Sequence, residues 1–234
     1  MANSSAASQR IACALRERIE GGGLPPGTRL SEEALGRELG VSRNTLREAF
    51  RLLVHDGLVV HLLNRGVFVR VLEPADVTDI YRMRAALQSA GVRAAAMAPA
   101  ALREAVTAAV ADAEDAAHAG DWSRVATADL RFHRALAALA GSARIDAAMD
   151  RLLAELRLAF HAMPSPRHFH APFVARNRAL ATLLERGEHT AAEAELAAYL
   201  TDACRLILDA LRTGPAARTP VVRADAAPPE EESR

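Results

Sequence analysis

The chain has 234 residues, half of them hydrophobic, which is enough for two modest domains with apolar cores and excludes a disordered protein. Its 29 basic residues balance 29 acidic residues, so net charge alone indicates no nucleic-acid partner. The distribution is more informative, because residues 1–72 hold ten Arg against seven acids, whereas residues 73–234 hold nineteen Arg against twenty-two acids. The positive excess therefore lies in the first third of the chain.

The sequence predicts a protein that is neither secreted nor inserted in a membrane. Cys13 and Cys204 are far apart and lack a CxxC spacing, so we expect each to be a buried free thiol. No apolar run reaches the roughly 18 residues of a membrane span. The first ten residues, MANSSAASQR, lack the basic start and apolar middle of a signal peptide. We therefore expect a cytoplasmic location.

The first predicted element is a helix from Ser8 to Glu20, which places Ile11, Leu15 and Ile19 on one face. Three glycines end it. The short segment Thr28-Arg29-Leu30 then predicts a strand that can pair with a later hairpin.

Two helices joined by a tight turn are predicted between Leu30 and Val60. Ser31 can cap the first helix, Gly40 can end it, and Ser42 can cap the second. The apolar stripe of the second helix is Leu46, Ala49, Phe50 and Leu53. That stripe leaves on the open face Arg43, Asn44, Arg47 and Arg51. This layout is typical of a DNA-reading helix-turn-helix, although an Arg-rich helix face by itself is also typical of ordinary solvated surface.

A basic hairpin comes after the second helix. Its two β-rich segments, Leu58–Leu62 and Val67–Val71, flank the turn signal Asn64-Arg65-Gly66. A hairpin beside a recognition helix is a wing that can contact the phosphate backbone or the minor groove. Together with the charge distribution, it favours a DNA-binding function over ordinary surface.

The remainder of the chain predicts only helices. Pro74 breaks the chain and Asp76 can cap the next helix, so we place one domain at residues 6–72 and an all-helical domain at residues 76–212. The predicted helices are Asp76–Met97, Pro99–Ala119, Asp121–Ala140, Ala143–His161, Pro172–Arg186 and Thr190–Arg212. Residues 163–172 are predicted to be an irregular connector and residues 213–234 a disordered tail. The expected fold is mainly α, with a winged helix-turn-helix followed by an antiparallel bundle of about six helices.

The segment LPPGTRLSEEALGRELGVSRNTLREAFRLLVHDGLVVHLLNRGVFV resembles the winged helix-turn-helix of the GntR transcription regulators. The resemblance implies DNA contacts from Ser42, Arg43, Asn44, Thr45 and Arg47, and from Arg65 and Gly66 of the wing. Arg43 and Arg47 suit bidentate contacts to guanine, whereas the hydroxyls of Ser42 and Thr45 suit phosphate oxygens at a helix N-terminus. Asn44 stands where the family often has Thr, and it can either shift base preference or hold a phosphate.

The segments DVTDIYRMRAALQSAGVRAAA and ADLRFHRALAALAGSARI resemble the FCD ligand-sensing domain of the FadR subfamily. The resemblance implies a small-molecule cavity, in which many members bind a divalent metal through Asp, a His four residues later, and two further His. Asp129 and His133 match the first pair, but Asn177 and Tyr199 stand where the other histidines are expected. An amide and a neutral phenol are poor transition-metal ligands, so we expect no required cofactor and favour an empty or weakly held divalent metal site.

Two alternatives for the Asp129 and His133 pair stay open. Without a metal, the two side chains can form a hydrogen-bonded pair inside the bundle. A metal could instead gain a ligand from His161, His168 or His170, although the segment that holds the last two is more often simply exposed.

An organic effector is predicted to bind Arg84, because a guanidinium matches a carboxylate bidentately. Gln88 stands where the family pattern has Glu, so a competing anion near Arg84 is lost. The predicted effector site is Arg84, Asp129, His133, Asn177 and Tyr199. A solvent-facing or helix-pairing Arg84 is the alternative.

The predicted function is a ligand-responsive transcriptional regulator that binds a pseudo-palindromic DNA operator as a homodimer. We expect it to act as a repressor. Its effector is expected to be a small organic acid. One rival is a metal-dependent enzyme that uses the bundle site, but no nucleophile lies in a recognisable spacing. The other is a DNA-binding dimer without an effector.

Overall fold

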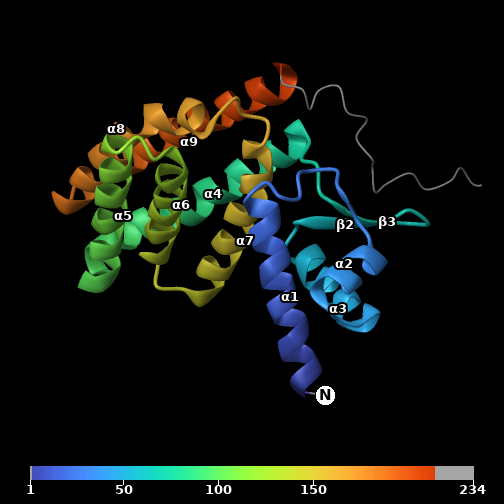
Figure 1. Ribbon diagram of the computed structural model, residues 1–234. Coiled ribbons are helices and arrows are strands. Elements are labelled where there is room, and N and C mark those ends of the chain that lie inside the picture. The colour runs from blue at the N-terminus through green and yellow to red at the C-terminus, as the bar shows by residue number, and fades with distance from the viewer. Residues whose placement is uncertain (1, 214–234) are drawn as a thin grey trace, which may run out of the picture. The chain divides into compact units, whose positions relative to one another are not determined.

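The computed structural model describes residues 2–213, with side chains from residue 6 onward, and is mainly helical (Figure 1). It divides into two compact units, one ending at Val71 and the other beginning at Leu72. Of the predicted tail, only Thr213, the last residue of the final helix, lies within the described residues. No described helix is both long and apolar enough to cross a membrane.

Three helices belong to the described part of the first unit: α1 (Ala2–Glu20), α2 (Glu32–Leu39) and α3 (Arg43–His55). The Ser31 hydroxyl caps α2 by accepting the Ala34 N–H at 3.2 Å, and Gly40 ends that helix at φ 65°. The predicted stripe of α3 is confirmed, since all four of its residues are buried. With Leu15 and Ile19 of α1, which are fully buried, that stripe forms the core of the unit.

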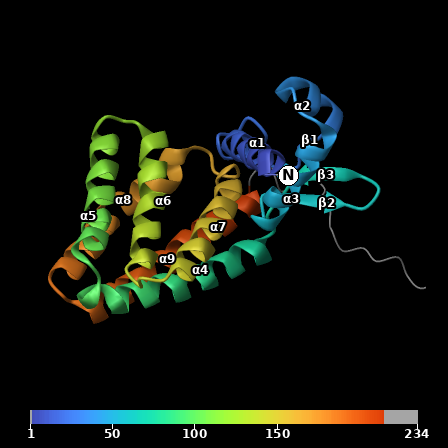
Figure 2. The ribbon, with the colours of Figure 1, turned by 90° about the horizontal axis from the view of Figure 1, so that it is seen from below.

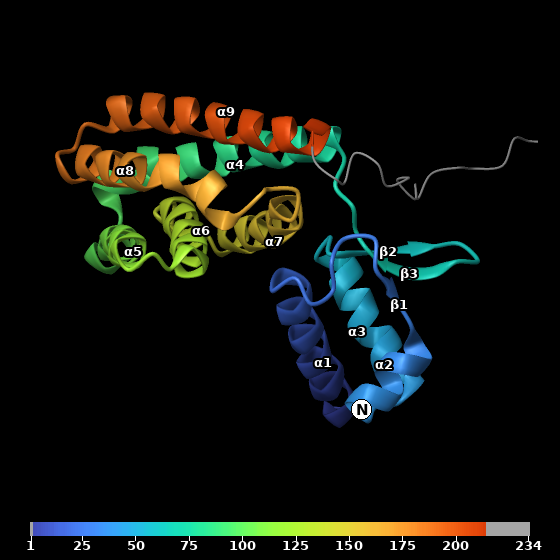
Figure 3. The ribbon, with the colours of Figure 1, turned by 45° about the horizontal axis from the view of Figure 1, so that its top comes forward.

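A three-stranded antiparallel sheet completes the first unit: β1 (Arg29–Leu30), β2 (Val59–Leu62) and β3 (Gly66–Val69), in the order β1-β3-β2. Val59 pairs with Val69 and Leu62 with Gly66, so β2 and β3 form the predicted hairpin (Figure 3). Arg29 pairs with Phe68 on the other side of β3. The predicted wing and its third strand are therefore confirmed.

Six long helices and a short 3₁₀ turn form the described part of the second unit: α4 (Pro74–Ala94), η1 (Ala95–Met97), α5 (Ala100–His118), α6 (Trp122–Ala138), α7 (Ala143–Phe160), α8 (Pro166–Glu185) and α9 (His189–Thr213). Figure 2 shows α5 and α6 side by side and antiparallel. In Figure 3, α5, α6 and α7 lie beneath a layer made of α4, α8 and α9. The expected helical bundle is confirmed.

A glycine allows α4 and α6 to cross at close range. A Cβ built on Gly91 would lie 1.8 Å from the carbonyl oxygen of Leu136, so the two backbones nearly touch. This contact places the middle of α4 directly against α6. The side chains one turn earlier on each helix, Gln88 and His133, consequently meet in the interior.

Helix α8 begins earlier than the sequence analysis predicted. The Ser165 hydroxyl accepts the His168 N–H at 3.2 Å, and Pro166 occupies the first turn, where a missing N–H costs no hydrogen bond. Pro172, predicted to start the helix, lies inside it. The predicted irregular connector was therefore wrong over most of its length, because the Ser-Pro pair is the stronger start signal and buried Phe169 anchors the first turns.

Two smaller predictions were also wrong. Glu73, not Asp76, is the N-cap of α4, and the Asp76 carboxylate accepts the Glu73 N–H at 2.8 Å from within the first turn. Both cysteines are free, but Cys13 is exposed and Cys204 only half-buried. Cys13 directly follows buried Ala12 and so points away from the apolar face of α1.

Candidate DNA interface and polar core of the helical unit

The predicted DNA-facing residues of the helix-turn-helix lie at the start of α3. Ser42, Arg43 and Asn44 are exposed, and Thr45 is half-buried. The Ser42 hydroxyl accepts the Thr45 N–H at 3.1 Å and lies 2.9 Å from the Thr45 hydroxyl. Ser42 therefore caps the helix while leaving the other N–H groups of its first turn open to an anion.

Arg47 is exposed on the same face but is paired within the unit. Its Nε donates to both oxygens of Glu32, at 3.0 and 3.1 Å, from the start of α2. The hydrogen bond and the charge of Glu32 raise the pKa of Arg47. Because the guanidinium is 62% exposed, water screens this pair and DNA can compete for it.

The wing tip presents residues that the sequence analysis did not single out. Leu63 is 83% exposed beside Arg65, which is also exposed. Gly66 has φ 100°, and a Cβ built on it would lie 3.7 Å from the Nε of Arg29, so a second guanidinium borders the turn. An exposed leucine in an otherwise polar turn is the signal that could have identified Leu63.

In the second unit, Asp129 of α6 is the centre of a buried polar cluster. Its Oδ1 accepts the Asn177 amide at 2.7 Å and the Tyr199 hydroxyl at 3.1 Å. Its Oδ2 accepts the His170 ring N–H at 3.1 Å. The fold thus joins three predicted residues with His170, which the sequence analysis expected to be exposed.

The cluster holds Asp129 in its charged form. Burial alone would raise the pKa of Asp129, but the hydrogen bond from His170 and the adjacent His133 ring keep it well below its ordinary value. Burial and the Asp129 charge raise the pKa of the Tyr199 hydroxyl well above its ordinary value. Tyr199 is therefore a neutral donor to a carboxylate anion.

The metal-free alternative expected a hydrogen bond between His133 and Asp129. That prediction was wrong, because the Nε2 atom of His133 lies 3.9 Å from Oδ1 of Asp129. Its Nδ1 instead donates to the Gln88 side-chain oxygen at 2.7 Å. Burial, and then the nearby Arg84 charge, lower the pKa of His133 to about 3. The ring is therefore neutral and keeps a lone pair on Nε2.

Arg84 is 2% exposed, so the solvent-facing alternative is wrong. Its Cζ lies 4.6 Å from the Tyr81 ring centroid, and no carboxylate of the described residues forms an ion pair with it. Four buried polar atoms of this region have no hydrogen-bond partner within residues 2–213: Tyr81 Oη, Arg84 Nε, Gln88 Nε2 and Asn177 Oδ1. Tyr81, which the sequence analysis missed, precedes Arg84 by almost one helical turn.

The residues present do not fit a transition metal. Both oxygens of Asp129 already accept hydrogen bonds, and His170 uses its Nδ1 proton for one of them. Among the described residues, no three His, Cys, Asp or Glu side chains are close enough to hold a metal ion. His161 and His168, considered as replacement ligands, are exposed.

Two family models match the chain: bacterial regulatory proteins of the gntR family over residues 7–69, and the FCD domain over residues 79–202. An HTH-type transcriptional regulator in the TAR-I ttuE-ttuC' intergenic region of Agrobacterium vitis is 37% identical over 131 residues, which are 54% of this chain and 77% of the relative. A protein named as a D-xylose utilization operon transcriptional repressor of Paenarthrobacter nicotinovorans is 31% identical over 186 residues, covering 78% and 82%. The crystal structure of a transcriptional regulator GntR from Rhodococcus sp. RHA1 has 42% identity and a TM-score of 0.79, over 86% of this chain and 97% of that one.

Proposed function

Because this chain belongs to the GntR family of bacterial regulatory proteins and carries an FCD domain, we propose that it is a homodimeric repressor controlled by a small hydroxylated organic acid. Its family and its relatives are transcriptional regulators, so it is a DNA-binding transcriptional regulator and not an enzyme. We also propose which residues read the DNA, and that the dimer assembles in the cytoplasm.

Two α3 helices related by a two-fold axis would read a pseudo-palindromic operator, with half-sites about 34 Å apart. Arg43 has no ion-pair partner among the described residues and is free to contact a base. Arg47 would leave Glu32 to reach guanine, which offers two acceptors to one guanidinium. Arg65 and exposed Leu63 would enter the minor groove or contact the backbone.

The test of base reading compares an operator, selected by the protein from random duplexes, with unrelated DNA at several salt concentrations. Arg47→Ala should weaken operator binding by about 1–3 kcal/mol and relax specificity at one position. Arg65→Ala should weaken all sequences similarly and reduce the salt dependence. Arg37→Ala, which removes an exposed guanidinium of α2, is the charge control. Equal losses on operator and unrelated DNA for Arg47→Ala would refute its base-reading role.

The single observation that carries the effector proposal is Arg84, a buried cation without a counter-ion in the described residues. Burying such a charge unpaired costs several kcal/mol, which a bound anion would offset. The effector would supply a carboxylate, because Arg84 Nε and Gln88 Nε2 are donors without acceptors. It would also supply a hydroxyl, because Asn177 Oδ1 is a buried acceptor without a donor among the described residues.

The effector is tested by calorimetry and thermal shift with matched pairs of acids: lactate and propionate, malate and succinate, gluconate and hexanoate. We expect binding by at least one hydroxy acid and at least tenfold weaker binding by its deoxy partner. Arg84→Gln should abolish binding, whereas Arg82→Gln, exposed on the same helix, should not. If no acid binds, the dimer without an effector is the better explanation. Undiminished binding by Arg84→Gln would place the effector elsewhere.

A further inference from the structure

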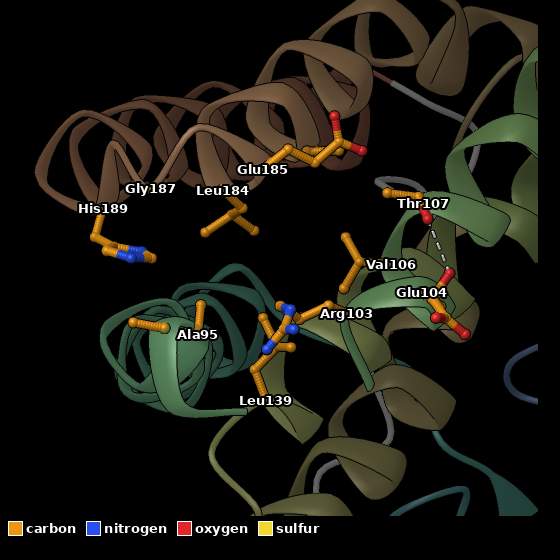
Figure 4. Close-up of a pocket in the computed structure, with 12 residues that line it drawn as sticks. Ala95, Arg103, Glu104, Val106, Thr107, Leu139, Leu184, Glu185, Gly187 and His189 are labelled. Atoms are coloured by element: carbon orange, nitrogen blue, oxygen red, sulfur yellow. Dashed lines mark hydrogen bonds between the residues drawn. The ribbon is translucent and has the colours of Figure 1, made fainter. Parts of the chain in front are cut away.

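We propose that the helical unit has a second ligand site, which takes a small hydrophobic carboxylic acid and is separate from Arg84 and the polar cluster centred on Asp129. The site is a pocket of about 510 Å³ at the end of the unit where α4, α6 and α8 finish and α5 and α9 begin (Figure 4). That volume lies within the range of about 300–1,000 Å³ that is usual for small-molecule pockets.

Most of the wall of this pocket is apolar. The apolar part is formed by Ala95, Val106, Leu139, Ala181 and Leu184. In Figure 4 the side chains of Leu184 and Val106 extend into the open space from opposite sides. Such walls suit a ring or a branched chain.

Two nitrogen-bearing side chains border the same space. Arg103 donates one N–H to the carbonyl oxygen of Ala98, which fixes the guanidinium beside the pocket. The Nδ1 atom of His189 is buried and has no hydrogen-bond partner in the described part of the chain. The carboxylates of Glu104 and Glu185 turn away from the centre in Figure 4. A carboxylate between them would accept a charge-assisted hydrogen bond from exposed Arg103 and give His189 Nδ1 a partner.

The pocket lies at the C-terminal ends of α4, α6 and α8, whereas Gln88, His133 and Asn177 lie further back on these helices. Ala95, Leu139 and Leu184 follow Gln88, His133 and Asn177 by six or seven residues, which is about 10 Å along each helix. The residues between these positions include Val92, Leu136 and Leu180, all fully buried. An apolar layer therefore separates the two sites, so each can be occupied without the other.

The experiment is calorimetric titration of the full-length protein with 3-phenylpropionate, and with 3-phenylpropanol as its neutral analogue. We expect one molecule of the acid per chain and about tenfold weaker binding of the alcohol. Arg103→Gln should weaken binding of the acid about tenfold, and Arg103→Lys should recover part of that loss. Leu184→Trp should block binding, because the larger ring fills the pocket.

Two controls separate this site from the rest of the unit. Arg186→Gln removes a nearby exposed charge that does not line the pocket and should leave binding unchanged. Arg84→Gln should also leave it unchanged, whatever it does to hydroxy acids. Loss of 3-phenylpropionate binding in Arg84→Gln, with normal binding in Arg103→Gln, would overturn the proposal. Undetectable binding of 3-phenylpropionate at millimolar concentration would also overturn it. If Leu184→Trp dissociates a dimer, the pocket is a contact between copies of the chain, and the proposal is overturned as well.

Discussion

Replacing His133 by Asn should remove most of the acid sensitivity of the helical unit. The neutral ring donates from Nδ1 to Gln88, and an asparagine amide keeps a donor near that position without titrating. Burial, and then the Arg84 charge, lower the pKa of His133 to about 3, from an ordinary value of 6.5. A depressed pKa means that the unfolded chain takes up a proton that the folded protein excludes, so stability falls as the pH drops from 6.5 towards 3.

The size of this effect depends on the two pKa values. Between pH 7 and pH 4.5, one such histidine lowers the free energy of unfolding by about 2.5 kcal/mol, approaching 1.4 kcal/mol per pH unit. Asp129 also has a depressed pKa, but its contribution is lost only below its ordinary value of 3.8, outside this window.

The assay is urea unfolding of the wild type and the variant at half-unit steps from pH 7 to pH 4.5. His133→Asn should be less stable at pH 7, because the ring leaves a cavity, yet should lose about 2 kcal/mol less on acidification. His168→Gln, which alters an exposed ring, should retain the wild-type slope. Parallel curves for His133→Asn and the wild type would refute a buried neutral imidazole.

Three further changes have defined outcomes. Gly91→Ala should lower the free energy of unfolding in urea by about 3 kcal/mol or more, because the new Cβ meets the carbonyl oxygen of Leu136. The control Ala86→Gly, at an exposed position of the same helix, should lower it by about 1 kcal/mol. Equal losses would contradict the close crossing of α4 and α6. Glu32→Gln should tighten operator binding two- to fivefold by releasing its partner guanidinium, whereas Glu33→Gln on the same helix should change it less. Dialysis against a chelator should leave the melting temperature unchanged, and a fall of several degrees with stoichiometric loss of metal would show that a metal is bound after all.

Local signals in the sequence were sufficient for the first unit. Ser31 and Ser42 cap their helices, Gly40 ends one of them at positive φ, and the α3 stripe is buried as predicted. The caps and the turn depend on groups within four residues of one another, and the stripe repeats along a single helix, so the sequence signals lie in short segments. The wing was predictable for the same reason, since its strands and turn are adjacent in the chain.

The polar core was only partly predictable. The i, i+4 spacing and the family resemblance identified Asp129 and His133, and the replaced family positions identified Asn177 and Tyr199. They could not show that His170 occupies one carboxylate oxygen, because the ring is 41 positions from Asp129 and its segment appeared irregular. Two prolines within seven residues concealed a helix whose cap is Ser165.

The sequence alone determined the class of this protein, because caps, apolar stripes, a turn signal and a characteristic run of residues all act over short distances. Tertiary structure decided the chemistry of the sensing half. Gln88 and Tyr199 reach the partners His133 and Asp129 across 45 and 70 positions of the chain. Whether a buried donor or acceptor finds a partner depends on every helix packed around it, and no short segment carries that information.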